Sequence, residues 1–187
     1  PAINREYQEC LHRRNAKHAY YGMISYIDRK IGALRDALTN CGMADDTVII
    51  FAADHGEMMG ERGMWYKQHF FEWAAHVPLI FHAPSRWSPS RVTENCSLID
   101  IMPTLLDLAN DKPFVEYVDS IDGNSLVNAL HNDTSSLNDI AISEFAADGS
   151  TGPSRMVKKE NLKYMDLEGK ESLLFDLKKD PHETKNL

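Results

Sequence analysis

Apolar residues recur at helical spacing over the first forty positions, with charged residues between them. The apolar face comprises Ala19, Tyr20, Met23, Ile24, Ile27, Ile31, Leu34 and Leu38. This spacing predicts a long amphipathic helix over about residues 3–40, best defined from Ala16 onward. Gly42, in the polar stretch "NCGMADDT", is suited to end the helix, because glycine readily takes the left-handed conformation common at helix C-termini.

Two short apolar runs follow, "TVIIFAA" at 47–53 and "VPLIFHA" at 77–83. Neither alternates with polar residues, so both are predicted to be strands covered on both faces. The segment "HFFEWAA" between them predicts a short helix or an irregular turn, and "SLIDIMPTLLDLAN" after them is helical by spacing. Helices alternating with strands favour an α/β fold with a mainly parallel sheet, which we assign to residues 1–134.

The pattern changes after Gly123. There "NSLVNALHN" predicts a short helix. Short strands are predicted for "DIAISEF", for both halves of "SRMVKKENLKYMDL" and for the start of "ESLLFDLKKDPHETKNL", with a turn near Glu160 and Asn161. Strands joined by such short connections pair antiparallel. We therefore expect a small antiparallel C-terminal subdomain at residues 135–187.

Composition narrows the class of protein. The chain has 187 residues, 43% of them hydrophobic, which is enough for a sizeable core. Its net charge of −8 argues against a nucleic-acid partner or a polybasic membrane contact, since a phosphate surface would repel it. No run approaches the ~18 consecutive apolar residues of a membrane span. Cys10, Cys41 and Cys96 are odd in number and form no CxxC motif, which favours a reducing, cytoplasmic compartment.

Candidate chemistry follows the first apolar run, where Asp54 and His55 are adjacent and Lys67 comes a little later. In open α/β sheets, ligands gather at the carboxyl ends of strands. A carboxylate and an imidazole side by side can supply part of the coordination sphere of a divalent cation. Intervening glycines would let the chain turn and bring the Lys67 ammonium back to neutralise an anionic substrate oxygen. These glycines are Gly56, Gly60 and Gly63. The alternative is a capping aspartate, a surface histidine and a solvated lysine.

Four ordered blocks resemble the C-terminal half of sulfatases of the alkaline phosphatase superfamily. They are "YYGMISYIDRKIGALRDAL", "DDTVIIFAADHGEMMGERGMWYK", "FFEWAAHVPLIFHAP" and "SLIDIMPTLLDLA". The closing "LFDLKKDPHETKNL" is similar to a signature near the end of many sulfatases. The resemblance covers nearly the whole chain and is closest to choline-sulfatases. It implies an alkaline phosphatase-like α/β sandwich and a hydrolase of small sulfate esters.

The resemblance also implies roles for the site residues. A divalent metal ion would be held by Asp54 and His55 together with carboxylates outside this chain. Ca²⁺ is the first expectation, and Mg²⁺ or Mn²⁺ are alternatives because imidazole is a softer ligand than a carboxamide oxygen. Lys67 would contact the sulfate or the bridging leaving-group oxygen, as a catalytic and substrate-binding residue.

The resemblance to choline-sulfatases implies a quaternary ammonium substrate, choline sulfate. Such a cation is held by aromatic faces and carboxylates, because it has no hydrogen to donate. Glu144, at the end of "DIAISEF", aligns with a family position near the choline head group, and an exposed strand-end carboxylate is the alternative. Trp65 and Phe145 are candidates for an aromatic wall, with packing as their alternative role.

The chain departs from the family pattern in one respect. The family nucleophile is a formylglycine made from Cys or Ser in a "C/S-x-P-S/A-R" sequence, which does not occur here. The sequence has no initiator Met and begins directly in helical pattern, so we expect a fragment that is inactive alone and binds metal weakly. Alternatives to a sulfatase are a phosphonate monoester hydrolase or phosphodiesterase of the same superfamily, and a non-catalytic module with a relict site.

A fragment of this kind would expose apolar surface that the rest of the protein covers. We therefore expect the chain alone to form a homo-oligomer or to be poorly soluble.

Overall fold

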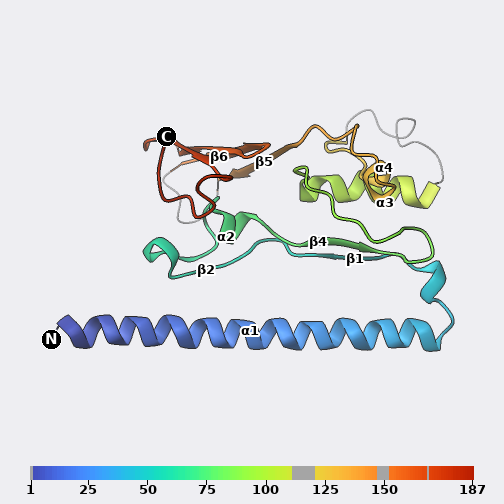
Figure 1. Cartoon of the computed structure of the whole chain (residues 1–187), viewed down its shortest axis with the longest axis horizontal. Coiled ribbons are helices and arrows are strands. Elements are labelled where there is room, and N and C mark those ends of the chain that lie inside the picture. Colours follow the sequence, from blue (N-terminus) through green and yellow to red (C-terminus); the bar gives the residue numbers. More distant parts are fainter. Residues whose placement is uncertain (1, 111–120, 147–151, 168) are drawn as a thin grey trace. The chain divides into compact units, whose positions relative to one another are not determined.

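The computed structural model describes the chain except for residues 1, 111–120, 147–151 and 168 (Figure 1). By their contacts the residues group into two units. Residues 1–67 with 77–86 form unit 1, and residues 68–76 with 87–187 form unit 2. Residues 87–134 thus group with the C-terminal strands in this division, and the domain boundary predicted at residue 134 stays a prediction.

Unit 1 begins with a single long helix, α1 (Ala2–Asn40), which confirms the predicted helix. Its end is a Schellman motif, in which the Met43 N–H donates to Leu38 O at 2.9 Å and the Gly42 N–H to Thr39 O at 3.0 Å. Gly42 has a φ of +69°, the left-handed conformation predicted for it. Neither α1 nor any other helix within the described ranges combines the length and the apolar composition that crossing a membrane requires.

Two strands of unit 1, β1 (Ile49–Ala52) and β4 (Leu79–His82), form the ribbon seen side by side in Figure 1. A short 3-10 helix, η1 (Ala44–Asp46), precedes β1. The strands pair antiparallel, with Ala52 opposite Leu79, so the parallel pairing expected for these two runs is wrong. A parallel pair needs a crossover of a dozen or more residues, usually a helix. Here the connection holds only a small hairpin and a four-residue helix, and it returns to the end of the ribbon that it left.

The ribbon also differs from the prediction in its burial. The residues of β1 and β4 are half-buried or exposed within this chain, rather than covered on both faces. Their apolar composition is that of strands with both faces packed. The described residues therefore supply only part of the packing that these strands are suited to.

The connection from β1 to β4 carries a second ribbon, formed by β2 (Met58–Met59) and β3 (Trp65–Tyr66). Its turn contains the 3-10 helix η2 (Glu61–Gly63). Gly60 opens the turn with a φ of +93°, a conformation that favours glycine. Tyr66 also has a positive φ, of +70°, which is uncommon for a residue with a side chain.

Unit 2 contains the remaining described helices and the C-terminal sheet. Its helices are α2 (Glu72–Ala75), η3 (Leu98–Asp100), α3 (Ile101–Asn110) and α4 (Val127–Leu130), as predicted in type and place. The carboxylate of Asp100 is buried and accepts the backbone N–H groups of Ser97 and Asn124, each at 2.7 Å. It thereby joins the start of α3 to the turn before α4.

The C-terminal sheet has four antiparallel strands in chain order, as the sequence predicted. They are β5 (Ile140–Phe145), β6 (Ser154–Lys159), β7 (Leu162–Leu167) and β8 (Leu173–Asp176). Glu160, in the predicted turn between β6 and β7, has a φ of +50°. The buried face carries Met156, Met165 and Phe175. Alternate residues of each strand face this core, which is the pattern that made the sheet predictable.

A buried ion cluster lies within unit 2. Lys163 of β7 is fully buried, and its Nζ lies 2.9 Å from Glu72 Oε1 and 2.9 Å from Glu183 Oε1. Glu183 Oε2 also accepts the backbone N–H of Glu72 at 2.8 Å. Since a buried charge is stable only when it is paired, this cluster ties the sulfatase-like closing segment to α2 and the sheet.

Candidate functional site

Asp54 and His55 lie just past the carboxyl end of β1, where the connection to β4 begins. The β2–β3 ribbon then folds the chain back on itself, with Met58 opposite Tyr66. Lys67 follows directly after β3, so the two ends of the hairpin bring His55 and Lys67 together. One short segment of unit 1 thus supplies a carboxylate, an imidazole and an ammonium.

His55 has a contact on each ring nitrogen. Nδ1 lies 2.8 Å from Gly56 O, and Nε2 lies 2.7 Å from Lys67 Nζ. A carbonyl oxygen only accepts and an ammonium only donates, so the two contacts fit the tautomer with the proton on Nδ1. Nε2 therefore carries the lone pair. Histidines that bind metals have this arrangement, because their other ring N–H usually donates to a carbonyl or carboxylate.

Asp54 lies against the same ring. Its Oδ1 accepts the backbone N–H of His55 at 3.0 Å, and its Oδ2 lies 3.5 Å from His55 Nε2. The side chain of Asp54 is 88% exposed, so the carboxylate is accessible to a ligand. One carboxylate oxygen and one imidazole lone pair fit a divalent cation with mixed oxygen and nitrogen ligands.

The two residues fit only part of a coordination sphere. Across the ranges that the structure describes, no third His, Cys, Asp or Glu joins them in a cluster that could hold a metal ion. Six or more oxygen or nitrogen ligands are usual for the hard divalent cations, so most of the ligands would have to come from elsewhere. The expectation that further carboxylates lie outside the chain stays a prediction.

Glu144 lies in unit 2, near the end of β5. Its Oε1 accepts Arg155 Nε at 2.9 Å across the β5–β6 pair, and both side chains are mostly exposed. Phe145 is half-buried, whereas Trp65 of unit 1 is exposed. The exposed strand-end carboxylate that sequence reasoning weighed is what the structure shows, and a substrate contact for Glu144 stays a prediction.

Sequence reasoning gave no role to the residues that hold the turn of the hairpin. Arg13 Nη1 donates to Gly60 O at 3.3 Å, and Lys17 Nζ lies 2.6 Å from Glu61 Oε1. The available signal was weak. Arg13 and Lys17 are four positions apart and so lie on one helix face, but such a basic pair is usually solvated.

Comparison with known proteins identifies the family. The family model described as Sulfatase matches residues 2–111, and that of the C-terminal region of N-sulphoglucosamine sulphohydrolase matches residues 60–187. The chain belongs to the sulfatase family. Both matched regions include β3 and Lys67, whereas Asp54, His55 and β2 lie in the first region alone.

Individual relatives agree with this assignment. The sulfatase chain is 39% identical to a choline-sulfatase of Rhizobium meliloti (strain 1021), over 93% of this chain and 33% of that protein. It is 34% identical to an arylsulfatase of Clostridium perfringens (strain 13 / Type A), over 93% of this chain and 36% of that protein. The chain therefore spans about a third of the length of the curated relatives it matches.

Solved structures show the same likeness. A phosphonate monoester hydrolase of Agrobacterium radiobacter is 35% identical, with a TM-score of 0.76 over 89% of this chain and 36% of that chain. The α/β fold of the alkaline phosphatase type, followed by a small antiparallel layer, is thereby confirmed for this sulfatase chain.

Proposed function

We propose that this chain is the C-terminal part of an enzyme that hydrolyses sulfate esters. The observation that carries the proposal is the position of Lys67 Nζ, 2.7 Å from His55 Nε2, with Asp54 Oδ2 3.5 Å from the same nitrogen in a sulfatase-family chain. When an ester bond of a sulfate breaks, negative charge develops on the leaving oxygen. A fixed ammonium stabilises that charge more strongly in the transition state than in the ground state.

Asp54 Oδ2 and His55 Nε2 are proposed as two ligands of a divalent metal ion, with Ca²⁺ preferred and Mg²⁺ or Mn²⁺ as alternatives. Such an ion supplies Lewis-acid stabilisation of sulfate oxygens. The contact with Gly56 O keeps the lone pair of His55 on Nε2, toward Asp54 and Lys67. The formylglycine nucleophile and the remaining carboxylates are proposed to lie outside this chain, so the 187 residues alone would be inactive.

Choline sulfate is the proposed substrate, and the compartment is proposed to be the cytoplasm. The relative from Rhizobium meliloti is named a choline-sulfatase, and its 39% identity extends over most of this chain. Glu144 supports the proposal as an exposed carboxylate, the kind of group that attracts a quaternary ammonium. A substrate cation would have to compete with Arg155, which pairs with Glu144 at 2.9 Å. Exposed Trp65 offers an aromatic face of the kind that binds such cations.

Hydrolysis of phosphonate monoesters is the second candidate. The solved phosphonate monoester hydrolase is 35% identical to this chain, which supports it. A phosphonate monoester is, like a sulfate ester, a tetrahedral oxyanion with one leaving oxygen. The same ammonium and metal ligands would serve either ester.

The test uses the full-length protein that contains this chain. Steady-state kcat and KM are measured on choline sulfate, an aryl sulfate and an aryl phosphonate monoester. Lys67→Ala is expected to lower kcat on the preferred ester by about a hundredfold or more, with a smaller change in KM, because its contact strengthens in the transition state. Lys170→Ala, at an exposed lysine of the β7–β8 connection, is the matched control and is expected to be unchanged.

Metal content gives an independent readout in the same proteins. Asp54→Asn and His55→Ala are each expected to lower the bound divalent metal measured by elemental analysis. Normal turnover in Lys67→Ala, or full metal content in both ligand variants, would contradict the proposed roles. A higher kcat/KM on the phosphonate than on either sulfate would favour the second candidate.

A further inference from the structure

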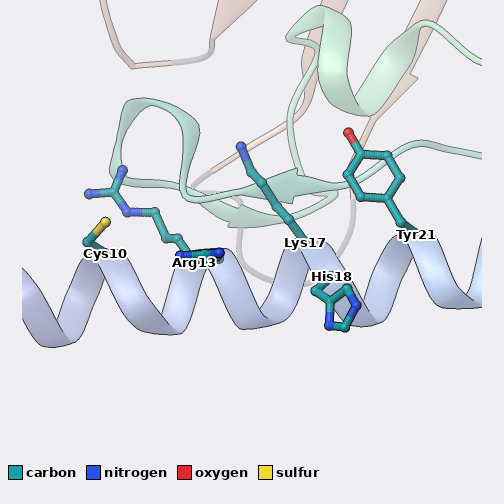
Figure 2. A pocket seen from close by; sticks show the side chains of 6 residues that line it. Cys10, Arg13, Lys17, His18 and Tyr21 are labelled. Atoms are coloured by element: carbon teal, nitrogen blue, oxygen red, sulfur yellow. The ribbon is translucent and has the colours of Figure 1, made fainter.

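One face of α1 meets the turn of the hairpin that carries Lys67 (Figure 2). A surface pocket lies along this face, and its lining residues are Cys10, Arg13, Arg14, Lys17, His18 and Tyr21. In Figure 2 the side chain of Lys17 rises toward the hairpin, whereas His18 points to the opposite side of the helix. Of the basic side chains that line the pocket, Arg13 and Lys17 contact the hairpin.

Lys17 holds the turn through Glu61. Its Nζ lies 2.6 Å from Glu61 Oε1, while Glu61 Oε2 accepts the backbone N–H of Met59 at 2.6 Å. The carboxylate thus bridges the ammonium of the helix and the last residue of β2. Burial opposes the charged form of Glu61, but the hydrogen bonds from Lys17 and from Met59 outweigh it and keep the carboxyl pKa below its ordinary value.

Arg13 contacts Gly60, the residue before Glu61, both by a hydrogen bond and by close packing. Its Nη1 donates to Gly60 O at 3.3 Å, and its side chain crosses directly over the glycine. A Cβ at position 60 would lie 2.2 Å from Arg13 Cδ, so the close approach depends on the missing side chain. The turn is therefore fixed to α1 at two consecutive residues, Gly60 and Glu61.

The turn determines where Lys67 lies. Met59 pairs with Trp65 and Met58 with Tyr66, so β3 takes its position from β2 and from the turn between them. Lys67 is the next residue along the chain, and its ammonium contacts His55. A shift of the turn would move β3 and, with it, Lys67.

We propose that Lys17 and Arg13 are positioning residues for Lys67, acting through Glu61 and Gly60 of the hairpin turn. This inference rests on the proposed catalytic role of Lys67. On this proposal the N-terminal half of α1 affects kcat through the hairpin turn and not by contacting the substrate.

The experiment is a double-mutant cycle in the full-length protein, with the preferred ester as substrate. Lys17→Met is expected to lower kcat by about tenfold to a hundredfold at similar KM, because small misplacements of a reacting group are costly. Lys17→Arg, which keeps the charge and the donor, is expected to restore most of the loss. In the Lys67→Ala background, Lys17→Met is expected to have no further effect. Arg14→Met, at the adjacent exposed arginine, is the matched control and is expected to match the parent.

The outcomes separate this inference from the proposed function. Equal unfolding midpoints for parent and Lys17→Met would show that the fold persists. The inference is overturned if Lys17→Met keeps the parental kcat, or if it lowers kcat by the same factor with and without Lys67, since a general structural effect does that. Normal turnover in Lys67→Ala would instead overturn the proposed function itself.

Discussion

The Gly56 carbonyl determines which nitrogen of His55 is available. Its contact with Nδ1 leaves the lone pair on Nε2, where the Lys67 ammonium lies at 2.7 Å. A divalent cation approaching Asp54 and His55 meets that ammonium at the same nitrogen. With the proposed roles, the Lys67 ammonium and a bound metal ion would therefore compete for His55 Nε2 until further ligands or an anionic substrate are present.

This competition predicts a gain of metal affinity when Lys67 is neutralised. We expect Lys67→Met to tighten binding of Ca²⁺ or Mn²⁺ to the 187-residue chain by about thirtyfold, because the repulsion between a unit charge and a divalent cation about 4 Å apart is worth about 2 kcal/mol in water. Isothermal titration calorimetry measures the change, and Lys170→Met is the control for a general loss of positive charge. Equal affinities of Lys67→Met and the parent would contradict the expectation.

A second prediction at this scale concerns Gly60 and Gly63, which share a left-handed backbone but differ in their surroundings. Gly60 has a φ of +93° and lies under Arg13, whereas Gly63 has a φ of +72° with nothing near its missing side chain. Alanine at either position incurs the left-handed penalty of about 1–2 kcal/mol. Gly60→Ala is expected to lower the free energy of unfolding further, because its methyl group displaces Arg13.

Chemical denaturation of the two variants measures the free energy of unfolding of each. The extra loss in Gly60→Ala over Gly63→Ala is the cost of displacing Arg13. Combining Gly60→Ala with Arg13→Ala should recover the excess loss, since the displaced side chain is then absent. Equal destabilisation by Gly60→Ala and Gly63→Ala would show that the Arg13 side chain moves away from position 60 with no loss in the free energy of unfolding. The close approach would then not fix the turn.

At the scale of secondary-structure elements, the accuracy of sequence reasoning depended on where the determining contacts lie. The C-terminal sheet was predictable because its strands alternate and its turns are local, as at Glu160. The pairing of β1 with β4 was not, because an unbroken apolar run shows burial but not direction. The hold of Arg13 on Gly60 could not be predicted either, since it joins residues 47 positions apart and leaves no periodic signal.

The ion cluster around α2 gives these elements a pH dependence. Burial opposes ionisation of Glu72, but the hydrogen bond from His76 and the charge of Lys163 outweigh it and hold the pKa of Glu72 well below its ordinary value of 4.5. The folded state therefore binds fewer protons than the unfolded state just below that value. The stabilisation is fully present above pH 4.5 and is lost as the pH falls toward the folded pKa.

We therefore predict that the free energy of unfolding falls as the pH is lowered below about 4.5, with Glu72 contributing up to one proton to the slope. Urea titrations at a series of acidic pH values measure the slope. Glu72→Gln removes the titrating group and should give a shallower dependence, whereas Glu171→Gln, at an exposed glutamate, should not. The same slope in Glu72→Gln and the parent would exclude this cluster as the source.

At the scale of the whole chain, apolar surface is left exposed along α1. Its predicted apolar face includes Ile24, Ile27 and Leu34, whose side chains are 49%, 48% and 53% exposed. The apolar β1 and β4 strands are likewise incompletely covered. Isolated exposed apolar residues are ordinary, but a continuous stripe marks an interaction surface. The chain spans about a third of the length of the curated relatives it matches, so a longer parent protein, as proposed, would supply surface to cover these residues.

We predict that the 187-residue chain by itself dimerises or is poorly soluble, and that the α1 stripe is the cause. Light scattering after size-exclusion chromatography measures its mass, and a monodisperse monomer would contradict the prediction. Ile24→Lys with Ile27→Lys should reduce association by placing charge on the stripe. A control with Asp28→Lys and Asp36→Lys changes the net charge more but leaves the stripe intact. If association persists in the control and falls in the stripe variant, the apolar contact is its cause. A pure charge effect would change association more in the control, because the control alters the net charge more.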